Sequence, residues 1–179
     1  MKKFFALVLL LLVIATGAFA LEITTIGGGG MFNLTNYSLD GGGGNSVKGF
    51  GAFGFIGVSE FFEFNLGYIN KKNDWDNSLS ALMLGALFKY PFDITEQVVL
   101  FPSVGLDFEF TLSEWFWDED YTWHELWLRG GLGIDFLVTE NLFLRGHFNY
   151  GLGLVIGDYF DDYKFSNGLL IKAGIGYMF

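Results

Sequence analysis

The sequence predicts an all-β fold, an eight-stranded antiparallel up-and-down transmembrane β-barrel. From Leu142 to Ile156 the residues alternate between apolar side chains and polar or small ones, interrupted at Gly146. Because side chains along a strand point alternately to opposite faces, one face of this segment is apolar and the other carries charges. The pattern recurs along a chain that contains 22 Phe and 26 Gly. An apolar outer wall around a polar interior is typical of a barrel in a bilayer.

A membrane-spanning helix is not predicted. Apolar residues make up 51% of the chain, yet no apolar run after Ala20 approaches the roughly 18 residues that such a helix needs. The longest run, from Ala81 to Phe88, is followed by Lys89. Strands closed into a barrel are the other way for a chain to satisfy its backbone polar groups inside a bilayer.

The first 20 residues are predicted to be a signal peptide. Lys2 and Lys3 form a basic start, residues 4–15 form an apolar core, and Ala18-Phe19-Ala20 forms a small-x-small cleavage site. We therefore expect export, with residues 21–179 forming one barrel domain. The chain has no Cys, so neither a disulfide nor a lipid-anchored cysteine is expected.

Eight strands are expected in the mature chain. They lie near Glu22–Leu34, Ser46–Val58, Phe62–Asn70, Leu79–Phe92, Val98–Leu112, Leu126–Val138, Leu142–Ile156 and Leu169–Phe179. Which face of the first two strands points inward stays open, because the glycine runs at 27–30 and 41–44 hide the alternation.

The connections between these strands alternate in length. Three are short, at Ser59–Phe61, Asp93–Gln97 and Thr139–Asn141. Four are longer, polar and mostly acidic, at 35–45, 71–78, 113–125 and 157–168. Short turns at one end of a barrel and long loops at the other are typical of bacterial outer-membrane barrels.

The end of the chain carries a more specific likeness. Its last strand presents Ile171, Ala173, Ile175, Tyr177 and Phe179 on one face, which resembles the terminal signal that outer-membrane barrels show to their assembly machinery. With the signal peptide, the eight strands and the unequal connections, the mature chain is similar to the small outer-membrane barrels of the OmpA and OmpX type. The resemblance implies location in the bacterial outer membrane, with its lipid and the barrel assembly machinery as partners. No cofactor is expected.

Charged residues are predicted inside the barrel, where they must pair. An eight-stranded barrel is only just wide enough for side chains to fill, and an isolated buried charge is very costly. Arg145 and Asp135 each lie five residues from Glu140, so they are expected directly opposite each other. Arg129 and Glu109 each lie ten residues from Glu119, so they are expected to face each other as well. Alternation places four acids and four bases inside: Glu63, Asp107, Glu109 and Asp135, with Lys89, Arg129, Arg145 and Lys172. We interpret this set as a structural plug, with a small gated conduit as the alternative.

Nucleic-acid and nucleotide binding are not expected. The net charge of −10 leaves no basic footprint for nucleic acid. Gly49–Gly54 matches the G-x-G-x-x-G pattern, but a strand follows it instead of the helix that would bind a pyrophosphate.

The third long connection, 113–125, is the densest surface feature of the sequence. Its candidate contact residues are Trp115, Trp117, Asp118, Asp120, Tyr121 and Trp123. Asp118, Asp120, His124 and Glu125 could offer metal ligands, but their spacing matches no EF-hand or zinc pattern, so no metal site is predicted. The aromatic residues fit an interfacial girdle equally well. Together the long connections hold 11 acids (one, two, five and three), which could form a negative rim.

These features predict a non-enzymatic surface barrel with a structural and adhesion-type binding role. Its loops would contact lipid headgroups, a host surface or another extracellular ligand. The alternative is a membrane-embedded lipid-modifying enzyme that uses His147, the one strand histidine in this assignment, together with a neighbouring side chain.

Overall fold

The computed structural model describes residues 22–38, 44–73, 78–112, 124–156 and 165–179. Within these ranges no helix is both long and apolar enough to cross a membrane. They form nine strands: β1 (Thr25–Ser38), β2 (Gly44–Gly57), β3 (Phe62–Asn73), β4 (Ser78–Lys89), β5 (Phe92–Thr95), β6 (Val98–Thr111), β7 (His124–Leu137), β8 (Leu142–Ile156) and β9 (Phe165–Met178).

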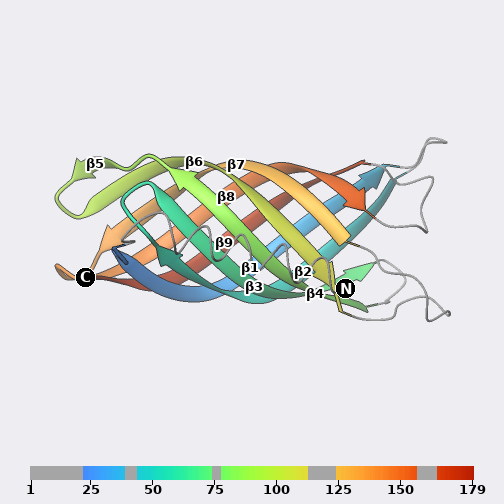
Figure 1. The fold of residues 1–179 in the computed structure, drawn as a ribbon, viewed down its shortest axis with the longest axis horizontal. Coiled ribbons are helices and arrows are strands. Elements are labelled where there is room, and N and C mark those ends of the chain that lie inside the picture. Colours follow the sequence, from blue (N-terminus) through green and yellow to red (C-terminus); the bar gives the residue numbers. More distant parts are fainter. Residues whose placement is uncertain (1–21, 39–43, 74–77, 113–123, 157–164) are drawn as a thin grey trace.

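Eight of these strands close into one antiparallel ring. Each long strand pairs with the next along the chain, β4 pairs with β6, and β9 pairs back with β1. Figure 1 shows the long strands tilted across one another around a common axis. The predicted eight-stranded up-and-down antiparallel barrel is therefore confirmed.

The ninth strand, β5, departs from the predicted strand boundaries. The sequence predicts one strand over Leu79–Phe92, but β4 ends at Lys89 and Phe92–Thr95 pairs separately with β6. Pro91 lies between the two segments and has no N–H to donate, which explains the break. The β5–β6 hairpin extends beyond the ring at one end of the barrel (Figure 1).

The strands also run further than predicted at the opposite end of the barrel. β1 and β2 stay paired as far as Ser38 and Gly44, in a segment that the sequence predicts to be a loop. Polar side chains there lie on both faces, which hides the alternation of a strand. Thr35 is buried inside, where its Oγ1 donates to Asn33 Oδ1 at 2.6 Å, while Asn36 is exposed and donates to Asn167 Oδ1 at 3.3 Å. Likewise β3 reaches Asn73, and β7 and β9 begin at His124 and Phe165.

The wall of the barrel has an apolar outer face and a mostly polar inner face. On β1, Ile26 is exposed while Met31, Asn33, Thr35 and Tyr37 are buried inside. This settles the side assignment that the glycines left open. On β8 the same division places Leu152 outside and Arg145, His147 and Asn149 inside.

The short turns share one local device, a hydroxyl that accepts backbone N–H groups. Ser59 Oγ accepts from the N–H groups of Phe61 and Phe62, at 3.2 and 3.3 Å. Thr139 Oγ1 accepts from Asn141 and Leu142 in the same way, at 3.3 and 3.0 Å. Such side-chain bonds stabilise tight turns. We call this end of the barrel the short-turn end, and the end where β1, β3, β6 and β8 finish the long-loop end.

Candidate functional site

The interior near the short-turn end is organised around Arg145. Its Nε and Nη2 donate to both carboxylate oxygens of Asp135, each at 2.7 Å, and Nη1 donates to Glu63 across the barrel. Lys89 Nζ also donates to Glu63, at 3.2 Å. Arg145 and Asp135 are direct partners in the β7–β8 register, at the positions that their equal spacing from Glu140 predicts. The two-point geometry makes this the strongest kind of ion pair.

Three phenylalanine rings surround the same guanidinium. The centroids of Phe55, Phe101 and Phe143 lie 4.3, 4.9 and 5.0 Å from Arg145 Cζ, within the range of cation–π attraction. Phe101 and Phe143 lie directly opposite Gly133 and Gly176, and a side chain at either glycine would overlap the ring. These glycines therefore make room for the rings that enclose Arg145.

A second cluster of charges fills the interior toward the long-loop end. Lys71 donates to Glu109, and Arg129 Nη2 donates to the same carboxylate at 3.1 Å. Arg129 Nε also lies 2.8 Å from Asp107 Oδ2, and its guanidinium stacks 4.2 Å from the Trp127 ring. Because these side chains are buried, each charge depends on its neighbours for neutralisation.

Glu125 is the acceptor that ties this second cluster together. Its Oε1 accepts the Tyr37 hydroxyl at 2.5 Å, and its Oε2 accepts the Trp127 indole N–H at 2.9 Å. Lys71 Nζ lies 3.4 Å from the same carboxylate. The Glu125 carboxylate thus links β1, β3 and β7 inside the barrel.

The register predicted for Arg129 and Glu109 is wrong. Arg129 lies opposite Gly105, and Glu109 lies opposite Glu125. The prediction took Glu119 as the centre of the connection, whereas the last paired residues, at 110 and 124, are centred on position 117. A shift of two residues in the centre of the connection shifts the residue that faces Glu109 by four positions, from Arg129 to Glu125. The long Arg129 side chain nevertheless reaches Glu109.

Two interior charges were assigned to loops by sequence. Lys71 and Glu125 are 1% and 3% exposed, and both point into the barrel. The signal was present: each continues the alternation of its strand, Lys71 after Ile69 and Glu125 before Trp127. With them, the interior of the described strands holds five acids and five bases: Glu63, Asp107, Glu109, Glu125 and Asp135, with Lys71, Lys89, Arg129, Arg145 and Lys172.

A small polar group lies between the two charged clusters. Ser103 Oγ and His147 Nε2 are hydrogen-bonded at 2.8 Å, and Lys172 Nζ donates to Asn65 Oδ1 at 3.1 Å. His147 and Lys172 are direct partners in the β8–β9 register. The serine comes from β6, so the sequence of β8 alone does not reveal this partner of His147.

The predicted loop contacts lie outside the described residues. Trp115, Trp117, Asp118, Asp120, Tyr121 and Trp123 all fall in the segment 113–123. The described residues contain no group of three or more His, Asp or Glu side chains that could hold a metal ion. Glu125 points inward while His124 packs outside against Phe108 and Phe110, so these two cannot share one ion.

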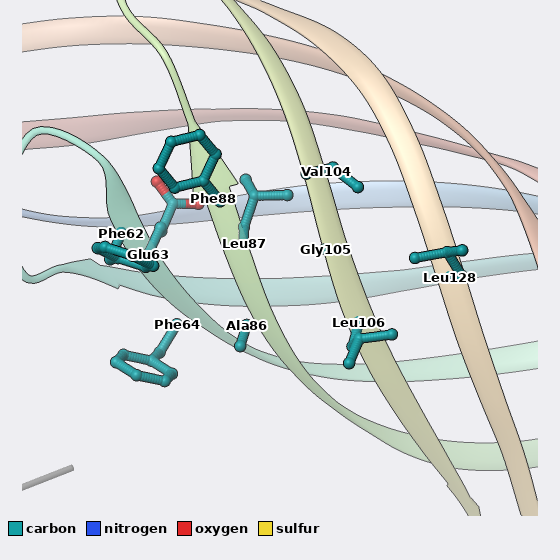
Figure 2. Close-up of a pocket in the computed structure, with 10 residues that line it drawn as sticks. All are labelled: Phe62, Glu63, Phe64, Ala86, Leu87, Phe88, Val104, Gly105, Leu106 and Leu128. Atoms are coloured by element: carbon teal, nitrogen blue, oxygen red, sulfur yellow. The ribbon is translucent and has the colours of Figure 1, made fainter.

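The outer wall carries an apolar groove of about 290 Å³ over β3, β4 and β6, with Leu128 of β7 at its edge (Figure 2). It is lined by Phe62, Glu63, Phe64, Ala86, Leu87, Phe88, Val104, Gly105, Leu106 and Leu128. Ala86 lies between Phe64 and Leu106, so its small side chain forms the depression. Glu63 is the one charged residue of this lining, and its carboxylate bonds inward to Lys89 and Arg145. The groove therefore offers an apolar surface rather than a reactive centre.

The comparisons with known proteins agree with this architecture. The family model described as outer membrane protein beta-barrel domain matches residues 6–179. Neisserial surface protein A is similar in structure, with a TM-score of 0.57 and 20% identity over 87% of this chain and 97% of that one.

Two further solved structures are more distant. OprG from Pseudomonas aeruginosa has a TM-score of 0.49 and 13% identity over 88% of this chain and 97% of that one. Ail of Yersinia pestis, in complex with the heparin analogue sucrose octasulfate, has a TM-score of 0.47 and 14% identity over 88% of this chain and 100% of that one. No curated protein matches the chain.

Proposed function

The chain belongs to the outer membrane protein beta-barrel domain family, and on that premise we propose that it is a non-enzymatic surface barrel whose long loops bind a partner outside the cell. It is a protein of the bacterial outer membrane. In such barrels the short turns face the periplasm and the long loops face outward.

The observation that carries this proposal is the balanced ionic interior. Five acids and five bases neutralise one another there, and rings enclose Arg145. A conducting path would need charges that face water, whereas these are buried; nine of them form ion pairs with one another, and Lys172 donates to Asn65. The interior thus supports a structural role, and the surface at the long-loop end is left to make contacts with partners.

The composition of the long loops supports a binding role. The segment 113–123 holds Trp115, Trp117, Trp123 and Tyr121 among acids that include Asp118 and Asp120. Large amphipathic aromatics dominate the energy of many interfaces, and an acidic rim attracts cationic partners. We propose these residues as contacts for an extracellular ligand such as lipid headgroups, a host surface or another protein.

Two processing steps belong to the same proposal. Residues 1–20 would direct export and be removed, leaving 21–179 as the barrel domain. Ile175, Tyr177 and Phe179 would then present the assembly signal. Their side chains lie on the outer face at the end of the chain, and the Tyr177 and Phe179 rings pack edge to face with centroids 5.3 Å apart.

Replacing residues 113–123 by a short Gly-Ser turn is expected to abolish adhesion and partner capture by intact cells, because the proposed contacts are removed. The replacement stops before His124, since Glu125 is part of the interior cluster. Whole-cell binding at equal surface level is the measurement. A matched control replaces 157–164 in the same way. Unchanged binding by the 113–123 variant would refute the loop proposal.

The Ser103–His147 hydrogen bond favours a second candidate, a lipid-modifying enzyme. A serine activated by a histidine is an acyl-transfer nucleophile when a third group orients the histidine and the substrate can reach the serine. In the described residues, no side-chain acceptor is hydrogen-bonded to His147 other than Ser103, and the histidine is buried inside the barrel wall. The pair therefore fits a hydrogen-bonded interior group better than a reaction centre.

Ser103→Ala is expected to lower the free energy of unfolding by about 1 kcal/mol, because one buried hydrogen bond is lost. It should leave the membrane lipids unchanged. Mass spectrometry of lipids from cells carrying the wild type, Ser103→Ala or His147→Gln checks this result. A modified lipid present with the wild type and missing with both folded variants would contradict the non-enzymatic proposal.

A further inference from the structure

Two lysines stand together on the outer wall of the barrel. Seven of the ten basic residues lie in the described ranges, and five of them are buried inside. The other two, Lys48 and Lys72, are exposed and are direct partners in the β2–β3 register. Two neighbouring ammonium groups can both donate to one anion, which offsets the repulsion between facing like charges.

The height of this pair on the wall matches the edge of a membrane. Phe62 is the first residue of β3 and lies at the short-turn end of the barrel. Lys72 lies ten residues further along the same strand. At about 3.3 Å per residue and a tilt of about 40°, this is about 25 Å, the height of the apolar band of such barrels. Outward-facing polar side chains adjoin it, since Asn70 Nδ2 and Tyr68 Oη both donate to Ser80 Oγ. Lipid phosphates lie at this boundary.

The wall below the lysines is apolar and suited to an acyl chain. Phe50 follows Lys48 on the same outer face and is 69% exposed, the most exposed aromatic ring within the strands. It packs against Phe32 with ring centroids 5.0 Å apart. Directly below this pair, Gly30 and Ala52 face each other and leave the wall recessed. A cationic headgroup site above a ring and a recess is complementary to an anionic lipid.

We propose that Lys48 and Lys72 form a site for the phosphate of a membrane lipid in the leaflet at the long-loop end, with its acyl chain lying over Phe50 and Ala52. Each ammonium has three donors, so either lysine can bind a phosphate oxygen while it keeps other contacts. The site is separate from the proposed loop contacts. It gives an acidic protein, of net charge −10, a local attraction to anionic lipid.

The absence of cysteine allows a site-specific test. Ala52→Cys carries a bimane fluorophore in vesicles of phosphatidylcholine with a small fraction of nitroxide-labelled phosphatidic acid or phosphatidylcholine. Labelled phosphatidic acid is expected to quench the fluorophore at a lower concentration than labelled phosphatidylcholine does. Each lysine present is expected to lower that concentration about fivefold. Leu132→Cys, on the exposed wall of β7, is the matched position and should show no such preference.

Charge variants decide between the outcomes. Lys48→Gln/Lys72→Gln should remove the preference for phosphatidic acid at Ala52. Lys48→Arg/Lys72→Arg should keep this preference, which would also show that the barrel folds with both lysines replaced. Gln97→Glu lowers the net charge by one, as the loss of one lysine does, but at an exposed position at the short-turn end. It should leave the preference for phosphatidic acid at Ala52 unchanged. Equal preference at both labelled positions, or a preference that survives the double Gln variant, would overturn the proposal. Displacement by inorganic phosphate beyond that by chloride at equal ionic strength would overturn the assignment to a lipid.

Discussion

Arg145→Ala is expected to lower the free energy of unfolding of the barrel by about 3–5 kcal/mol, because it leaves Asp135 without a partner and Glu63 with Lys89 alone. Urea unfolding in lipid vesicles, followed by tryptophan fluorescence, measures the loss. The free energy of unfolding of the Arg145→Lys variant is expected to lie between those of the wild type and the alanine variant. The lysine keeps the charge but loses both the two-point bond to Asp135 and the planar stack on the rings.

The double variant Arg145→Ala/Asp135→Ala separates a buried pair from two independent effects. Removing both members of a buried pair costs less than leaving one of them unpaired. The double variant is therefore expected to recover part of the loss caused by Arg145→Ala. Losses that simply add would mean that the two side chains do not interact in the folded barrel.

The sequence predicted the sidedness of the wall because alternation is a local property of a strand. Leu152 outside and Arg145 inside follow from parity alone, and a short turn fixes which residues face each other, as with Arg145 and Asp135. Where glycines remove the alternation, on β1 and β2, the sidedness came only from the structure. Pro91 likewise divides what reads as one apolar strand.

Contacts across the barrel and across long connections could not be predicted in this way. Glu63 meets Arg145 from a strand 82 positions away, and nothing in either local pattern pairs them. The centre of the connection between β6 and β7 is not fixed by its length, so Arg129 was paired with the wrong facing residue. Lys71 and Glu125 had the right parity, but polar composition near a strand end is also typical of a loop.

Arg129→Met is expected to destabilise the barrel by about 3–5 kcal/mol, as much as the loss of Arg145. Without Arg129, the buried carboxylate of Asp107 loses its ion pair, and those of Glu109 and Glu125 keep Lys71 as their one ion-pair partner among the described residues. The Trp127 ring also loses the guanidinium stacked on it. Unfolding in vesicles measures the effect, and Lys71→Met, which leaves Arg129 between Asp107 and Glu109, is expected to cost less.

A second change on the Arg129→Met background then tests where Glu125 lies. If its carboxylate belongs to the interior cluster, Glu125→Gln relieves the excess negative charge, and the double variant should recover part of the lost stability. Glu119→Gln removes the same charge from a residue of the neighbouring connection and should recover nothing. Equal recovery by both changes would mean that the net charge of the protein, and not the buried cluster, determines the cost of losing Arg129.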